Sequence, residues 1–439
     1  MSNPSYDHVP VRVDSINIEG LGRTKDDYVR RFIGDLFKAS NFSELAYLAT
    51  EVGKKLETIG CFNKVNVIID TSKSPEASSY DYDVTYVVNE SKRIAGGINT
   101  VIGSNEGSII LSSRLPNVVG RGERISFEHA FGSNNKSSHL SFAKPIPQLS
   151  SSETSITFYQ NKISNVQGGF SVFSRGSLFD FCFGSVQRVK HNMQWEGTWR
   201  ELEAASRLTS FAIREQSGHS FKSALRHIMT VDHRDQPIFP NQGIFLRLSQ
   251  EYAGAGGDVA YLKNESDLQV NIPLPFELVL QGAFRFGVFR PLDEFPAYNS
   301  SDLFFLGGPH SLRGFEMKSL GPRSGSEVLG GKSYWSSGVH LYAPLPFAFG
   351  KGSFGDYCRT HLFVNAGNIT EQSFSFQGDE IKASLENLVA DYKAAYGLGL
   401  AIRLGQIARI EINYCWPLRF SSVDKIVRGM QLGIGVEFI

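Results

Sequence analysis

The chain has 439 residues, with 44 basic and 44 acidic side chains, so its formal net charge at pH 7 is zero. This balance argues against a nucleic-acid-binding protein, which needs a basic surface to hold phosphates. The 43 Gly, 33 Phe and 16 Tyr are typical of a large antiparallel β structure with tight turns and aromatic girdles.

Neither a membrane-spanning helix nor a metal site is predicted. No run of 18 apolar residues occurs, but barrel strands need only about 9–11 residues each and escape such a search. Residues 1–10 lack a basic segment followed by an apolar core, so we expect no secretory signal. The four cysteines are far apart and form no CxxC motif, which argues against a zinc site or a disulfide framework. They are Cys61, Cys182, Cys358 and Cys415.

Residues 9–92, which follow an N-terminal tail of residues 1–8, form one small α+β domain of predicted order β-α-α-β-β. Thr24 with Asp27 three residues later resembles a capping box and predicts the start of the first helix. Asn41 and Glu44 open the second helix, and Gly60 ends it.

From residue 93 to the C-terminus, apolar and polar residues alternate in many short segments, most clearly in residues 396–404, 408–416 and 430–438. One apolar face per strand, with charge on the other, suits a barrel between lipid and a wet lumen. The predicted fold is therefore an all-β transmembrane barrel of about 16 antiparallel strands, in residues 93–439, after the α+β domain. A soluble β-sandwich also alternates, but here the alternation continues to the last residue without a second core.

A long connection at about residues 290–332 carries an arginine between bulky apolar groups, in the run Leu312-Arg313-Gly314-Phe315. A loop of this length without repeats is usually functional or disordered. Folding back into a wide lumen would place Arg313 against polar groups and bury Phe315. The alternative is an ordinary exposed surface loop.

These motifs support a family resemblance. The Leu312–Phe315 run, the preceding Leu306-Gly307-Gly308-Pro309 and the single N-terminal domain resemble the BamA-type bacterial surface antigen superfamily. More narrowly, the chain resembles the channel (core barrel) subunits of the mitochondrial sorting and assembly machinery (the SAM or TOB complex). Three further segments carry this closer resemblance, namely Trp195–Leu202, Leu341–Phe347 and Phe363–Asn368.

The resemblance implies that residues 9–92 are a polypeptide-transport-associated (POTRA) domain. It also implies that Leu312, Arg313, Gly314 and Phe315 tuck into the lumen and brace the barrel. Bacterial relatives supply an Asp where this chain has Asn365, and His340 on the return strand is not a carboxylate either. The sequence leaves open whether Arg313 is held by neutral hydrogen bonds or by a carboxylate. The lumen-facing candidates are His340, Asn365 and Glu411.

The first and last strands form a predicted lateral seam. Adjacent glycines near the start of the first strand weaken it, and a poorly closed seam offers backbone groups that a client strand can capture. The alternative is that these glycines only accommodate a bend. The residues assigned to the seam are Gly96, Gly97, Ile98, Asn99, Gln431, Gly433 and Gly435.

The C-terminal strand also carries a motif. By resemblance, it fits the β-signal of mitochondrial barrels, in the order polar, x, Gly, x, x, hydrophobic, x, hydrophobic. The matching residues are Gln431, Gly433, Val436 and Phe438. The resemblance makes this motif the sorting signal of the chain itself.

We therefore predict an insertase of the mitochondrial outer membrane that folds β-barrel precursors by templating the client's β-signal strand at the seam. The missing secretory signal, the single soluble domain and the closing motif favour mitochondria, with the N-terminal domain in the intermembrane space. No HExxH, P-loop or GxSxG motif occurs, so we expect no enzymatic activity, cofactor or metal. By resemblance, the partners are metaxin-like peripheral subunits and cristae-organising (MICOS) proteins. Two rivals are a translocator that passes clients through the lumen and a passive diffusion pore.

Overall fold

The computed structural model describes residues 9–75, 77–103, 106–132, 135–146, 152–186, 188–292, 298–345, 357–376, 378, 380–405 and 408–435. The chain divides into two compact units. One comprises residues 1–97, 111–128 and 140–157, and the other comprises residues 98–110, 129–139 and 158–439.

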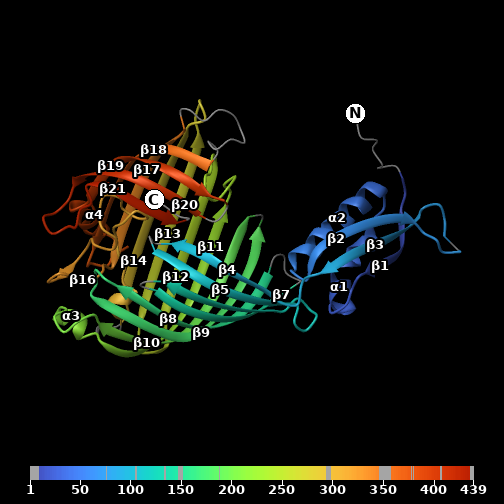
Figure 1. The fold of residues 1–439 in the computed structure, drawn as a ribbon, viewed down its shortest axis with the longest axis horizontal. Helices are drawn as coiled ribbons and strands as arrows, with labels where there is room; N and C mark the ends of the chain where they lie inside the picture. Colours follow the sequence, from blue (N-terminus) through green and yellow to red (C-terminus); the bar gives the residue numbers. More distant parts are fainter. Residues whose placement is uncertain are drawn as a thin grey trace. The chain divides into compact units, whose positions relative to one another are not determined.

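The first unit contains an α+β domain whose element order is the one predicted (Figure 1). Its elements are β1 (Arg12–Glu19), α1 (Asp26–Ile33), η2 (Gly34–Lys38), α2 (Phe42–Thr58), β2 (Phe62–Thr71) and β3 (Asp81–Glu90). The sheet has the order β1-β3-β2, with β1 parallel and β2 antiparallel to β3. The apolar face of α2 supplies Leu45, Ala49 and Leu56 to a buried core that also contains Val84 and Tyr86 of β3.

The helix starts were predicted with mixed success. The Asn41 side chain accepts a 2.8 Å hydrogen bond from the Glu44 N–H, as a cap of α2 should. The predicted cap at Thr24 is wrong, because α1 begins at Asp26 with Lys25 as its N-cap residue. The Thr24 hydroxyl donates instead to the Glu90 carboxylate at 2.7 Å. The Thr24 hydroxyl oxygen also accepts from the Asn117 side-chain amide at 2.8 Å, so both of its hydrogen-bonding roles are used away from the helix.

The remaining strands form one 16-stranded sheet in which neighbours follow chain order. The strands are β4 (Ala95–Gly103), β5 (Glu106–Pro116), β6 (Arg124–Gly132), β7 (Asn135–Ile146), β8 (Ser152–Asn165), β9 (Phe170–Val186), β10 (Val189–Ala204), β11 (Gly218–Asp232), β12 (Gly243–Gly257), β13 (Tyr261–Pro273), β14 (Val279–Pro291), β17 (Ser333–Pro344), β18 (Cys358–Thr370), β19 (Lys393–Leu404), β20 (Ala408–Arg419) and β21 (Gly429–Gly435). The connections contain α3 (Phe211–Arg214), η3 (Ser300–Asp302), α4 (Glu380–Ala390) and the hairpin of β15 (Arg323–Ser324) and β16 (Glu327–Val328).

In this sheet, polar side chains are buried on one face and apolar side chains are exposed on the other, which is the reverse of a soluble protein. On β20, the buried side chains include Glu411 and Asn413, whereas Tyr414 and Trp416 on the other face are 44% and 38% exposed. A soluble sandwich buries its apolar face, so this arrangement contradicts the sandwich alternative and matches strands that face lipid outward. Within the described ranges, no helix is both long and apolar enough to cross a bilayer.

Candidate functional site: a loop braced inside the sheet

The connection between β14 and β17 folds into the space that β10 to β21 enclose. Its chain is pinned by isolated bridges between Leu306 and Leu320 and between Gly308 and Leu312. The apolar side chains of the loop are buried together, including Leu306, Leu312, Phe315 and Leu320. The loop is therefore an ordered inner element, and the exposed-loop alternative does not describe it.

Arg313, at the tip of this loop, is fully buried and lies against Glu411 of β20. Its Nη2 and Nε atoms donate to the Glu411 Oε2 atom at 2.7 and 3.2 Å. The Asn413 amide donates to the same oxygen at 3.1 Å, and Arg409 contacts the other carboxylate oxygen at 2.9 Å. Burial of a lone charge would be costly, so this set of partners makes the buried pair tolerable.

His340 and Phe363 complete the pocket around the guanidinium. The Nη1 atom of Arg313 lies 3.4 Å from the His340 Nε2 atom, and its guanidinium lies 5.2 Å from the centroid of the Phe363 ring. His340 contacts His361 through their Nδ1 atoms at 3.2 Å, and His361 contacts the Asn413 side chain at 2.8 Å. A continuous polar chain thus joins β17, β18 and β20 around the tip.

Asn365 on β18 holds the backbone of the tip. With its amide oriented to suit its neighbours, the Asn365 oxygen accepts from the Arg313 backbone N–H at 2.6 Å. Its nitrogen donates to the Ala395 carbonyl at 2.8 Å. Of the three candidate partners named from the sequence, Glu411 and His340 therefore contact the guanidinium, and Asn365 contacts the main chain.

Gly314 is required by its backbone and by its surroundings. Its φ of +85° lies in the left-handed region, and a Cβ there would come within 2.9 Å of the Ala395 Cβ atom. Its N–H donates to the Gln431 side chain at 3.1 Å, and the Gln431 amide donates to the Phe315 carbonyl at 2.9 Å. Gln431, which the sequence assigned to the seam and the β-signal, thus ties the last strand directly to the loop tip.

The other seam residues lie on the two strands that end the sheet. Gly433 and Gly435 of β21 face Glu411 and Arg409 across the β20 ladder, and Gly435 has no room for a side chain beside His310. Gly96, Gly97 and Ile98 lie exposed on β4, and Asn99 belongs to the same strand. Val436 and Phe438 lie outside the described residues.

A second ion pair, which was not predicted from the sequence, anchors the root of the loop. Asp302 in η3 accepts from both terminal nitrogens of Arg200 on β10, at 2.5 and 3.3 Å, and both side chains are buried. The Tyr261 hydroxyl donates to the same carboxylate at 3.2 Å, and the Lys263 ammonium donates to the Asp302 carbonyl at 2.8 Å. The only sequence signal was Asn299 three residues before Asp302, which forms the capping box of η3.

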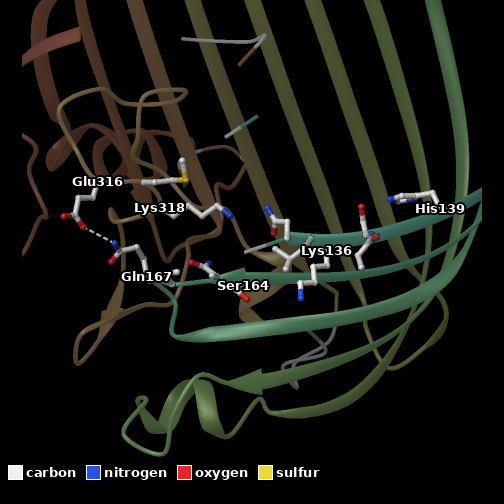
Figure 2. Close-up of a pocket in the computed structure, with 13 residues that line it drawn as sticks. Lys136, His139, Ser164, Gln167, Glu316 and Lys318 are labelled. Atoms are coloured by element: carbon white, nitrogen blue, oxygen red, sulfur yellow. Dashed lines mark hydrogen bonds between the residues drawn. The ribbon is translucent and has the colours of Figure 1, made fainter. Parts of the chain in front are cut away.

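An open cavity of about 640 Å³ separates the loop from β7 and β8. Figure 2 shows Glu316 and Lys318 of the loop on one side, with Lys136 and Ser164 across the space. The loop also contacts the β8–β9 turn, where the Gln167 amide donates to Glu316 at 3.0 Å (Figure 2) and the Val328 N–H donates to the Gln167 carbonyl at 2.8 Å. The loop is therefore tied to β10 and to β17–β21, while a polar opening remains beside the earlier strands.

Comparisons with known proteins agree with this architecture. The Omp85 superfamily domain matches residues 117–438. The sorting and assembly machinery component 50 homolog of Homo sapiens is 41% identical over 98% of this chain and 91% of its own length. Homolog B of Xenopus laevis is 42% identical with the same coverage. A crystal structure of BamA from Haemophilus ducreyi lacking POTRA domains 1–3 matches with a TM-score of 0.78 and 18% identity, over 97% of this chain and 84% of that one.

The predicted fold class, an all-β transmembrane barrel of about 16 strands, is confirmed by the Omp85 match and the BamA likeness. The family resemblance inferred from the loop motif is confirmed as well, since the relatives cover nearly all of the sequence. The chain therefore belongs to the Omp85 superfamily and, within it, to the sorting and assembly machinery component 50 family.

Proposed function

We propose that this chain is the insertase that folds β-barrel precursors into the mitochondrial outer membrane, by templating the client's last strand at the seam between β4 and β21. Its family membership supports a general role in β-barrel assembly at that membrane. The specific mechanism rests on one observation, which is the link between the braced loop and the last strand through Gln431.

The seam offers the chemistry that templating needs. In the described part of the chain, β21 and β4 are the end strands of the sheet, and β21 pairs with β20. A strand with one free edge presents N–H and C=O groups that an incoming strand can pair with. The adjacent Gly96 and Gly97 add no side chains to cross-strand packing, so pairing at β4 is weak.

The brace supports the fixed side of the seam. Arg313, Glu411 and Gln431 form one buried set across the loop, β20 and β21. A client strand that pairs at the seam would then meet a rigid β20–β21 edge, while β4 on the opposite side of the seam moves. Neither ATP nor a cofactor enters this mechanism, and no chemical step is catalysed.

The N-terminal α+β domain is proposed to be a POTRA domain in the intermembrane space that meets or releases precursors. Metaxin-like subunits on the cytosolic face and cristae-organising proteins inside are the proposed partners, and the outward apolar face contacts lipid.

Site-specific crosslinking of an arrested barrel precursor tests the proposal. Photo-crosslinkers placed one at a time over residues 95–102 should capture the client's last strand, with a two-residue period that reflects strand pairing. Crosslinkers at the exposed Leu398 and Tyr414, on β19 and β20, are the matched controls. Capture from the cavity residues Lys136 and Lys318 instead would favour the lumen translocator.

A further inference from the structure

The turn between β11 and β12, residues 233–242, lies inside the sheet. Its Ile238 and Phe239 side chains are each 2% exposed and pack against Val279, Tyr342 and Ala401. These partners come from β14, β17 and β19, so the turn reaches far beyond the two strands that it connects. A turn that only reversed the chain would be exposed, as connecting segments usually are.

Three arginines on three successive strands hold the turn. Arg359 of β18 donates to the Asn241 side chain at 2.7 Å and to the Pro240 carbonyl at 3.4 Å. Its guanidinium also lies 4.9 Å from the centroid of the Phe239 ring. The other two arginines donate at 3.0 and 3.4 Å, Arg403 of β19 to Gln236 and Arg409 of β20 to the Ile238 carbonyl.

The turn and the β14–β17 loop enter from opposite ends of the sheet, and both reach the face of β20 that carries Arg409 and Glu411. The loop leaves the end at which β14 finishes, and the turn lies at the end at which β12 and β14 begin. Arg409, which holds the turn, also contacts Glu411, which holds Arg313. Arg409 and Glu411 are two residues apart and therefore share one face of β20.

We infer that residues 233–242 form a second inner strap, which closes this part of the lumen and holds the β11–β12 wall against β18–β20. In sheet order, β13, β14 and β17 separate these two walls, so the strap bridges them directly. The strap and the loop together make β10 to β20 one rigid block and leave strand movement to the other part of the sheet. This function is distinct from templating and holds whether or not clients enter at the seam.

Replacement of Phe239 by Gly in the full-length protein tests the strap. The matched control is Phe276→Gly in the β13–β14 turn, which lies at the same end of the sheet, is 89% exposed and has a φ of +63° that Gly accepts. We expect Phe239→Gly, and not Phe276→Gly, to raise single-channel conductance in planar lipid bilayers. Amide exchange in residues 233–242 should also become at least ~10-fold faster.

Arg359→Gln provides an independent variant if Phe239→Gly fails to fold. It removes the donors to Asn241 and Pro240 from the opposite wall and leaves the turn sequence intact. Higher single-channel conductance and faster amide exchange in residues 233–242 would support the strap, provided that the heat-modifiability of the barrel matches that of the parent protein. Conductance and exchange at the parent values in folded Arg359→Gln, or equal increases in the Phe276→Gly control, would overturn it.

Discussion

Arg313 and Glu411 lie 98 residues apart in the sequence, yet the guanidinium and the carboxylate meet at 2.7 Å with neither side chain exposed. Arg409 lies on the other side of the same carboxylate, so two cations share one anion. Removal of Glu411 would leave two buried cations without their anion, whereas removal of either arginine leaves one buried cation–anion pair.

Arg313→Ala should release the loop tip without preventing membrane insertion of the barrel. Loss of one partner of a buried pair costs about 3–5 kcal/mol, and here Arg409 still balances part of the Glu411 charge. We expect faster protease cleavage within residues 298–332 and slower precursor assembly. Arg207→Ala, in the exposed β10–β11 connection, is the control. A wild-type assembly rate together with an unchanged digestion pattern would mean that Arg313 does not brace the barrel.

Asp302 and Arg200 should behave as one energetic unit at the root of the loop. Asp302→Asn and Arg200→Gln should each destabilise the loop by about 2–3 kcal/mol, because each leaves a buried charge without its partner. The double variant should be no less stable than the worse single variant, which a double-mutant cycle on loop proteolysis can measure. Additive effects would show that the two side chains act separately.

Glu90 should make the stability of the N-terminal domain dependent on pH. Burial opposes its ionisation, but hydrogen bonds from the Thr24 hydroxyl and from the backbone N–H groups of Thr24, Arg23 and Gly22 hold the pKa of Glu90 at about 2. Because this pKa lies below the unfolded value of 4.5, the stabilisation is present above pH 4.5 and is lost as pH falls toward 2.

Glu90→Gln should therefore destabilise the domain by about 2 kcal/mol at pH 7 and by progressively less below pH 4.5. Labelling of the fully buried Cys61 thiol by a pyridyl disulfide, followed by peptide mass spectrometry, reports opening of this domain at each pH. Glu19→Gln, on the exposed side of β1, is the matched control. A pH-independent difference between Glu90→Gln and the parent protein would contradict the assignment.

A disulfide across the seam should block client assembly reversibly. Cys is introduced at position 98 together with Cys at either 432 or 434, and position 435 is avoided because a side chain there would meet the His310 ring. Oxidation should stop precursor assembly, and reduction should restore it, with the barrel folded throughout. The control joins Leu398 to Tyr414, which face each other across β19 and β20. Equal inhibition by both crosslinks, or by neither, would favour passage through the lumen.

The sequence by itself determined the local elements of this protein. Period-two alternation identified the barrel strands, and the turn-rich sequence around Leu312–Phe315 identified the inner loop, because both patterns depend on residues close together in the chain. The helix starts show the limit of such local patterns. Asn41 caps α2 by accepting from its near neighbour Glu44, whereas the Thr24 hydroxyl donates to Glu90, 66 residues later, and caps no helix.

Only the tertiary structure decided which lumen residues meet. Alternation shows that Glu411 faces away from the apolar side of β20, but strand register and loop path bring it to Arg313. Asp302 and Arg200 are 102 residues apart, and Phe239 and Arg359 are more than 100 residues apart. The capping box at Asn299 marks only the local turn of η3, and no local pattern identifies either distant partner. A buried ion pair needs two side chains at bonding distance, and the closing of the sheet, rather than the sequence of any one segment, sets that distance.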